Sequence, residues 1–446
     1  MAAVNITYYV RKSGDESNDG LTKETAFLTI QRTIDISNGL SSDSVVTVYI
    51  GAGDYTGDSR IVLTDTGNLE DVDFNFIGDI HGWATGDSGV VEVHSLYMEV
   101  SDGQRDVLFK NIKWTHAFMN AFPHASTVFY YHDGSDSSIS HLTFDGCTFE
   151  TPVEQGSGYA GAVVFDWGGT GTVKNCLFDT RGGVRFNGDA QKHGNKYCIG
   201  TFRRPGEDVT LNFYHNTFFM TDHPGSVINH FYASTTGGFD FEFLNNLIVD
   251  AQSCMVYCGE DDQSAVAVSG ENNYFDRTGT PAAYPFYDIA DQYLTITDAR
   301  VAEKETQSLH IGVDEEASPG PGVVPGTRYE LEEDSPCIDL GMEIGVTEDI
   351  ILSSRPYGAA PDTGCYELVR YFVLTVSNAG DVSITRSKFQ FRKYPVTDAK
   401  RRSIWIESAS SFFIAMNICN LNMVFPDEDV TKHPSWNVIA DGYQWN

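Results

Sequence analysis

FLNNLI, residues 243–248, recurs with variations at five other places in the chain, and this recurrence decides the fold. The other copies are FKNIKW at 109, FDGCTF at 144, VKNCLF at 173, FYHNTF at 213 and GENNYF at 270. Successive copies begin 35, 29, 40, 30 and 27 residues apart. A short sequence motif (here called the phrase) that recurs at unequal intervals is typical of stacked coils joined by loops of variable length.

Two positions of the phrase are candidates for the core. The last position is always large and apolar: Trp114, Phe149, Phe178, Phe218, Ile248 and Phe275. The position two residues earlier holds Ile112, Cys147, Cys176, Asn216, Asn246 and Asn273. Residues two apart on a strand share a face, so we expect both files to point inward, stacked about 4.8 Å apart. Buried amides need partners, which predicts a ladder of bonded asparagines. The alternative is a β-sandwich with asparagine-rich surface turns.

A second series of apolar segments follows the phrases. It reads TVFYYHD at 127, AVVFDWG at 162, YCIGTFR at 197, VINHFYA at 227 and MVYCGED at 255. Val128, Val163 and Cys198 are spaced by 35 and 35 residues, so each coil carries at least two strands. The two series together resemble the right-handed parallel β-helix of the pectate-lyase-like superfamily. The resemblance implies an all-β, single-stranded parallel β-helix.

The segments around the repeats predict three parts. Residues 1–60 are expected to form an N-terminal cap and first coil, with a strand at 6–10 and a short helix at 25–38 covering the open end. Residues 61–367 form the β-helix, although the pattern weakens after Phe275. SPCIDLG at 335–341 and PDTGCYE at 361–367 resemble the closing segment of secreted and viral β-helix proteins. Residues 368–446 are expected to be a small β-rich oligomerisation or attachment domain.

Charge and cysteine content restrict the classes of partner. The formal net charge is 29 − 62 = −33, which argues against nucleic-acid binding through long-range charge. The stretch MAAVNITYYV lacks the features of a signal peptide, and no run reaches transmembrane length. The eight cysteines are expected to be mostly buried free thiols, as in a protein made in a reducing cytoplasm. Whether Cys337 and Cys365 pair stays open.

Candidate site residues lie on the outward positions of the second series. The outward strip combines carboxylates, a guanidinium group and aromatic rings, as sugar sites do. Asp133, Asp166 and Arg203 are the candidate catalytic residues. The candidate glycan-binding residues are Tyr131, His132, Trp167, His230 and Tyr232, with Thr201 also predicted to face outward. Neighbouring coils would hold Asp133 and Asp166 about one strand spacing apart, near the roughly 5 Å that retaining glycosidases use. The alternative is that these residues belong to an ordinary polar outer surface that has no functional role.

Three functions fit this reading. The first is a virion-surface protein of a bacteriophage, a tailspike, fibre or capsid-decoration protein, as the resemblance to tailspike β-helices implies. It would be a homotrimer on the virion surface, held to other virion proteins by residues 368–446. The second is a polysaccharide depolymerase acting on host surface glycans, on a virion or extracellular. The third is a bacterial surface adhesin. We expect no metal or cofactor, no nucleic acid and no membrane partner.

Overall fold

The structure is a computed structural model in which the chain divides into two compact units, Met1–Leu368 and Val369–Asn446. In the first unit it describes residues 3–41, 43–57, 61–64, 72–100, 105–115, 118–119, 124–132, 141–150, 159–166, 169–179, 196–202, 209–219, 226–231, 239–249, 256–258, 266–277, 287–288, 305–312, 331–332, 335–356 and 359–368. In the second unit it describes seven strands.

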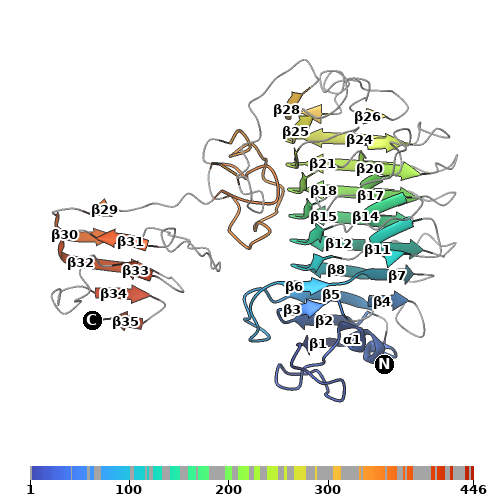
Figure 1. The fold of residues 1–446 in the computed structure, drawn as a ribbon, viewed down its shortest axis with the longest axis horizontal. Helices are drawn as coiled ribbons and strands as arrows, with labels where there is room; N and C mark the ends of the chain where they lie inside the picture. The colour runs from blue at the N-terminus through green and yellow to red at the C-terminus, as the bar shows by residue number, and fades with distance from the viewer. Residues whose placement is uncertain are drawn as a thin grey trace. The chain divides into compact units, whose positions relative to one another are not determined.

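Three long parallel sheets form the first unit (Figure 1). Sheet A contains β1 (Asn5–Val10), β2 (Val45–Ile50), β5 (Asp73–Gly78), β8 (Asp106–Lys110), β12 (His141–Asp145), β15 (Gly169–Lys174), β18 (Val209–Tyr214), β21 (Phe239–Leu244), β24 (Val266–Glu271) and β27 (Glu305–Thr306). Sheet B contains β3 (Gly53–Tyr55), β6 (Val91–Val93), β9 (Lys113–Trp114), β13 (Thr148–Glu150), β16 (Leu177–Asp179), β19 (Thr217–Phe219), β22 (Leu247–Val249), β25 (Tyr274–Arg277) and β28 (Leu309–Gly312). Sheet C contains β4 (Ile61–Thr64), β7 (Leu96–Val100), β11 (His124–His132), β14 (Tyr159–Asp166), β17 (Lys196–Phe202), β20 (Ser226–Phe231), β23 (Val256–Cys258) and β26 (Tyr287–Asp288).

The chain visits the sheets in turn and advances by one strand in each sheet per coil, which makes a right-handed parallel β-helix and confirms the predicted fold class. Each copy of the repeated hexapeptide begins with the last residues of a sheet A strand. It ends with the first residues of the following sheet B strand. The strand β10 (Phe118–Met119) is an exception, pairing antiparallel with β11. From β2 onward, and apart from the longer connection between β5 and β6, two residues join each sheet A strand to the next sheet B strand, as Asn175 and Cys176 do.

Stacked aromatic rings fill the interior of the coils. Phe76, Phe109 and Phe144 follow one another on sheet A, with ring centroids 5.0 and 5.6 Å apart. On sheet B the centroid of Phe178 lies 4.8 Å from that of Phe149 and 4.7 Å from that of Phe218. These side chains are fully buried. Parallel pairing in register puts like beside like, so the large last residue of each phrase packs on its counterpart in the next coil.

The predicted asparagine ladder is present at the turn between sheets A and B. Asn216 donates from Nδ2 to Asn246 Oδ1 at 3.0 Å, and Asn246 donates to Asn273 Oδ1 at 3.1 Å. Each amide also donates to a carbonyl of the preceding coil, as Asn246 does to Phe213 O at 2.8 Å. Each amide oxygen accepts from the backbone N–H of its predecessor, as Asn273 Oδ1 does from Asn246 N at 2.8 Å. These buried amides are therefore fully paired, as buried polar groups require.

In the seven coils from β8 to β27, a residue in the left-handed region precedes the inward position of the turn. These residues are Asn111, Gly146, Asn175, His215, Asn245, Asn272 and Gln307, with φ between 53° and 65°. Asparagine and glycine tolerate this conformation better than other residues, which explains their frequency at the third position of the phrase.

The pattern continues for one coil beyond the predicted repeats. β24 pairs with β27, and β25 pairs with β28, opposite Leu309. The segment ETQSLH at 305–310 is a seventh copy: Gln307 has positive φ, and Ser308 takes the ladder position, accepting from Asn273 N at 3.0 Å. It was not predicted because glutamine and serine replace the asparagines and His310 replaces the apolar last residue.

The N-terminal helix α1 (Ile30–Ser37) is shorter than the predicted 25–38. Residues before it are extended: Phe27 N donates to Tyr9 O at 2.9 Å and bridges to Val10, so this segment pairs with β1. Ile30 and Ile34 are buried in the core cluster of the coils, so the helix covers the first coil with its apolar face.

The second unit also consists of parallel strands that alternate between two sheets. One sheet contains β29 (Thr375–Val376), β31 (Ser403–Ile406) and β33 (Asn422–Val424). The other contains β30 (Ala379–Ile384), β32 (Ala409–Met416), β34 (Asn437–Ala440) and β35 (Tyr443–Trp445), of which β34 and β35 pair antiparallel. The strands of this unit therefore stack coil upon coil, as the strands of the first unit do. The seven lysine and arginine residues between 386 and 402 lie outside the described residues.

Removing one rung of the ladder should destabilise the first unit strongly. Asn246→Ala leaves Asn216 N and the carbonyl of Phe213 without their buried partner, so we expect a loss of about 3 kcal/mol in the free energy of unfolding. Urea unfolding followed by circular dichroism measures the loss. Asn212→Ala, at a half-buried outward position of β18, is the control and should cost less than about 1 kcal/mol. Equal losses in the two variants would contradict the ladder's role.

Candidate functional site

The strip predicted from the second strand series lies on sheet C. Tyr131 lies opposite Asp166 in the pairing of β11 with β14, and His132 lies opposite Val100 of β7. On the next coil, Asp166 lies opposite Phe202. Asp133, Trp167, Arg203 and Tyr232 lie outside the described residues. The site roles predicted for this strip therefore stay predictions.

One expectation about the strip is wrong, because Thr201 is fully buried. Cys198 and Ile199 are both buried next to it, and the register skips Cys198: Tyr197 pairs with Gly161, and Ile199 with Val163. Ala162 on the partner strand is skipped as well, so the register is the same on both sides of this interruption, which recurs in neighbouring coils. Two consecutive buried residues shift the alternation of faces by one residue.

The register of β14 with β17 also differs from the predicted stacking. Val163 lies opposite Ile199, not Cys198. His230 lies opposite the buried Thr201, one file away from Tyr131 and Asp166. His230 therefore shares a file with a buried residue, and the register does not place it on the same outward strip as Tyr131 and Asp166.

The outer face of sheet A carries hydrogen-bonding side chains in register from coil to coil. We call the following residues the sheet A file: Thr7, Thr47, Asn75, Leu108, Thr143, Thr172, Asn212, Glu242 and Ser269. All are half-buried or exposed. Apart from Leu108, every member can donate or accept a hydrogen bond. The sequence analysis missed this file, although its signal is visible: polar residues alternate with apolar ones in VTVYI, DFNFIG and HLTFD.

A carboxylate pair and a histidine begin three successive strands of sheet A. Asp106 follows Asp73 by one coil and donates its backbone N–H to Asp73 Oδ1 at 2.8 Å, and His141 lies opposite Asp106. Burial raises the pKa of Asp73, and the charge of Asp106 raises it further. Burial lowers the pKa of His141, whose Nε2 lies 3.3 Å from Thr172 Oγ1. A pair of carboxyl groups on neighbouring coils, one of them with a raised pKa, is an arrangement that acid–base chemistry can use.

Further charges lie at the opposite end of the sheet A strands. Asp145 Oδ2 lies 3.8 Å from Lys110 Nζ and 3.5 Å from Lys174 Nζ on the neighbouring coils. Tyr214 donates its hydroxyl to Glu242 Oε2 at 2.5 Å. Burial and the charge of Glu242 raise the pKa of Tyr214, so the phenol stays protonated and remains a donor. The outer face thus offers donors and acceptors across its full width.

Residues 335–368 form a segment, here called the strap, that packs along the turns between sheets A and B (Figure 1). Asn245, a left-handed turn residue, exchanges two hydrogen bonds with the backbone of Met342, at 2.8 and 2.9 Å. Thr363 Oγ1 donates to Asn272 O at 3.1 Å, and Cys365 N donates to Thr217 Oγ1 at 3.0 Å. The strap therefore ties successive coils together along their side. Its two cysteines, 337 and 365, are buried free thiols.

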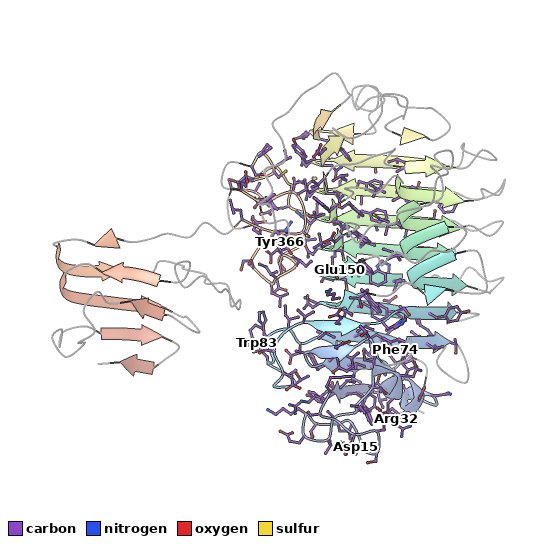
Figure 2. All side chains as sticks on the ribbon, viewed as in Figure 1. Asp15, Arg32, Phe74, Trp83, Glu150 and Tyr366 are labelled. Carbon is purple, nitrogen blue, oxygen red and sulfur yellow. The ribbon has the colours of Figure 1, made fainter. Side chains whose placement is uncertain are left out.

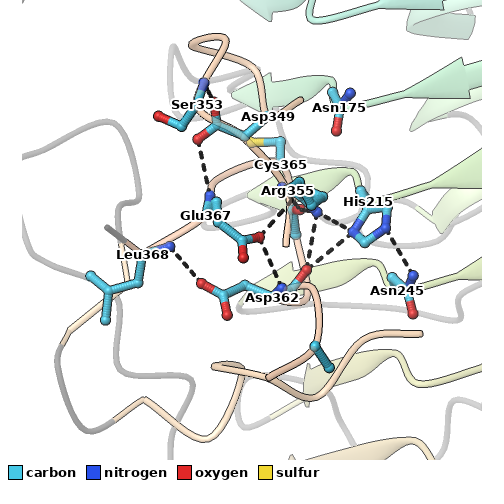
Figure 3. A network of polar contacts seen from close by, with 12 residues as sticks. Asn175, His215, Asn245, Asp349, Ser353, Arg355, Asp362, Cys365, Glu367 and Leu368 are labelled. Atoms are coloured by element: carbon cyan, nitrogen blue, oxygen red, sulfur yellow. Dashed lines mark hydrogen bonds and ion pairs between the residues drawn. The ribbon is translucent and has the colours of Figure 1, made fainter. Parts of the chain in front are cut away.

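A buried ionic network holds the strap in shape (Figure 3). The fully buried Arg355 donates to Gly364 O from both terminal nitrogens at 3.0 Å, and its Nε lies 3.4 Å from Glu367 Oε2. Arg355 also contacts Nδ1 of the buried His215. Burial raises the pKa of Asp362 to about 6, although its carboxylate accepts the backbone N–H groups of the residues at 339 and 368. Because these groups are out of reach of solvent, the network serves stability and not chemistry on a ligand.

Two absences among the described residues bear on the kind of site. Among the described residues, no three His, Cys, Asp or Glu side chains lie close enough together to hold a metal ion. No helix in the described part of the chain is long and apolar enough to cross a membrane.

Comparison with known proteins adds a likeness in fold. No protein-family model matches the chain, and no curated protein matches it. Among solved structures three chains match, including the crystal structure of pectate lyase Pel9A. The identity to that chain is 14%, the match covers 82% of this chain and 97% of the other, and the TM-score is 0.39. At this identity the likeness concerns the fold and says nothing about chemistry.

The histidine under the strap should make stability depend on pH. Burial, and then the charge of Arg355, lower the pKa of His215 well below its ordinary value. The unfolded chain therefore binds a proton below about pH 6.5 that the folded chain does not bind, and stability falls as the pH falls. His215→Asn removes this dependence and suits the left-handed turn, where other coils carry asparagine.

We expect the stability of the native chain relative to His215→Asn to fall as the pH drops from 7.5 to 5. The slope should approach about 1.4 kcal/mol per pH unit well below pH 6.5. Asp362 titrates in both chains with the opposite sign, since its raised pKa stabilises the fold as the pH falls from about 6, so the comparison cancels it. Urea unfolding at each pH measures the difference, and parallel pH profiles would show that His215 is not held neutral.

Proposed function

We propose that the protein binds an extended polysaccharide along the outer face of sheet A. The observation that carries the proposal is the sheet A file, in which one hydrogen-bonding side chain per coil recurs over most of the described length of the sheet. Coils repeat about every 4.8 Å, close to the length of one sugar unit in an extended chain. Such a periodic surface matches a periodic ligand with many hydroxyl groups.

The predicted strip on sheet C adjoins this face at one corner of the coil. β14 ends at Asp166 and β15 begins at Gly169, so only two residues separate the two strands. His141 lies opposite Thr170 of β15, at the sheet A side of the same corner. The backbone positions of Tyr131 and Asp166 therefore lie within one turn of the protein chain from a glycan that is bound on sheet A. This proximity supports a binding role for both sheets.

Removing two hydroxyl groups from the middle of the file should weaken binding. Thr143→Val with Thr172→Val keeps the side-chain shape and deletes two hydrogen-bonding groups on neighbouring coils. We expect the dissociation constant to rise roughly tenfold, since a hydrogen bond contributes about 0.5–1.5 kcal/mol. Electrophoresis in native gels containing host capsular polysaccharide, lipopolysaccharide O-chains, xylan or polygalacturonate measures the affinity as retardation.

A threonine on another sheet provides the control. Thr148 is half-buried on sheet B, and Thr148→Val makes the same chemical change away from sheet A. It should migrate as the native protein does. If the double variant is retarded as strongly as Thr148→Val by every polysaccharide, sheet A is not the binding face.

The carboxylate pair supports a second function, cleavage of the bound polysaccharide. Asp73 and Asp106 begin neighbouring strands, about one strand spacing apart, which is near the separation of roughly 5 Å used by retaining glycosidases. Asp73, with its raised pKa, would act as the acid, and Asp106, which is exposed, would act as the nucleophile. The carboxylates predicted on sheet C, Asp133 and Asp166, would be the alternative pair.

Amide substitutions distinguish the two pairs. If the sheet A pair cleaves, Asp106→Asn should lower the release of new reducing ends at least 1,000-fold while leaving retardation in polysaccharide gels nearly unchanged, because the loss affects the transition state more than binding. Asp166→Asn should then retain full activity. Loss of activity only in Asp166→Asn would assign cleavage to sheet C, and no new reducing ends with any tested glycan would leave the protein a binder.

For the biological setting we propose a bacteriophage virion surface, as a tailspike, fibre or decoration protein, with an extracellular adhesin as the alternative. The separate unit from Val369 onward supports a role in assembly, because its two short sheets end, among the described strands, in the edge strands β29, β33, β30 and β35. Unpaired strand edges are ready sites for pairing with another chain. A homotrimer would use them against copies of itself or other virion proteins.

Mass in solution tests this assembly role. We expect the full chain to behave as a trimer in light scattering coupled to size exclusion, and a chain ending at Leu368 to behave as a monomer. The boundary follows the division between the two compact units, so the shortened chain keeps the whole first unit. A full chain that remains monomeric at micromolar concentration would contradict the virion assignment.

A further inference from the structure

Trp83 is the most exposed large apolar side chain among the described residues, with 79% of its surface accessible. It lies on the loop from Asp79 to Val90 that connects β5 to β6 (Figure 2). Tryptophan side chains are highly buried on average. An exposed indole on an ordered loop therefore needs an explanation other than packing.

The loop is held rigid by one carboxylate. The buried Asp79 accepts hydrogen bonds from Trp83 N at 2.9 Å, Ala84 N at 2.8 Å and Thr85 N at 2.7 Å. It also accepts from Thr85 Oγ1 at 2.9 Å. The backbone closes with Gly89 N donating to Ile80 O at 3.0 Å. The indole is thus presented in a fixed position, which lowers the entropy that a ligand must overcome on binding.

The surroundings of the indole are aromatic on one side and polar elsewhere. The ring of His81 lies against Trp83, with centroids 4.5 Å apart and an interplanar angle of 33°. Within the same loop, Asp87 forms a bidentate ion pair with Arg11, at 2.6 and 2.7 Å. The other residues next to the indole in sequence are small or polar. Val90 is the loop's other exposed large apolar residue.

This composition distinguishes between kinds of ligand. A protein partner would need a contiguous apolar patch, and the loop offers a single ring in polar surroundings. A sugar ring needs one aromatic face for its C–H groups and polar neighbours for its hydroxyl groups. The ring of His81 lies against the indole, and the same loop carries polar groups in the ion pair of Asp87 with Arg11.

The loop also continues the path of the sheet A face. Asp79 directly follows β5, whose Asn75 belongs to the sheet A file. On the two preceding coils Tyr9 and Tyr49 stack outward with centroids 6.0 Å apart. Aromatic surface therefore leads along the strand ends toward the loop.

We propose that the Asp79–Val90 loop is a sugar-binding subsite in which one pyranose ring of a polysaccharide stacks on Trp83 beside His81. The inference rests on the proposed polysaccharide binding by sheet A and adds the residue that anchors the chain at the N-terminal coils. The subsite binds a single ring by stacking, whereas the sheet A file binds hydroxyl groups along the chain.

Electrophoresis of the full-length protein in gels containing xylan, polygalacturonate, capsular polysaccharide or O-chains tests the subsite. Trp83→Ala should weaken retardation about tenfold in the polysaccharide that binds the native protein, equivalent to about 1.4 kcal/mol. Trp83→Tyr, which keeps a stacking ring, should restore most of the affinity. Leu21→Ala is the matched control, because Leu21 is a half-exposed apolar residue on a different loop.

The outcomes separate this inference from the proposed function. If no polysaccharide retards the native protein, both are overturned. If Thr143→Val with Thr172→Val weakens retardation and Trp83→Ala does not, the subsite alone is overturned and sheet A binding stands. Oligomer formation that disappears in Trp83→Ala, measured by light scattering, would assign the indole to a protein contact and also overturn the subsite. Equal thermal midpoints of Trp83→Ala and the native chain exclude misfolding as the cause of lost binding.

Discussion

The two-residue turn between sheets A and B is the constraint on which the rest of the β-helix depends. A residue in the left-handed region turns the chain from sheet A to sheet B, and the next residue points into the core. In three successive coils that inward residue is an asparagine whose amide donates to the backbone of the previous coil, and the first two also donate to the next asparagine. Buried amides are costly unless every group is paired, so the ladder permits only one register of coil on coil. Cys147 uses the same geometry more weakly, with its thiol 3.3 Å from Phe109 O.

The strap extends this logic to the outside of the turns. Its backbone bonds to the turn residues themselves, Asn245 and Asn272, and its buried Arg355 neutralises the carboxylate of Glu367 while contacting His215. Breaking a buried ion pair leaves an uncompensated charge, so the network makes attachment of the strap specific as well as strong. A solenoid has only neighbour contacts between coils, and a strap that spans several coils couples them. Stability is thus concentrated on the turn side.

The outer face of sheet A has a different role. The inward side chains of the sheet A strands pack in the core, and the outward side chains face solvent in straight files because the coils are in register. The same regularity that stacks phenylalanine on phenylalanine inside therefore stacks threonine, asparagine and glutamate outside. Acid–base chemistry becomes possible where the files carry titratable groups, as at Asp73 and Asp106. Partial burial and neighbouring charges raise the pKa of Asp73 above its ordinary value.

The sequence by itself determined the coils, the inward files and the ladder, because these depend on a local phrase whose period and residue types are visible in one dimension. It also located the cap and the strap through short motifs. Only the tertiary structure decided the interruption of pairing before Thr201, the seventh copy of the motif at Gln307 and the docking of the strap on His215. Such an interruption changes which residues share a face without changing composition, and contacts between residues 140 positions apart leave no periodic signal. The sheet A file was present in the alternation of its strands, but its importance became visible only when the register placed its members side by side.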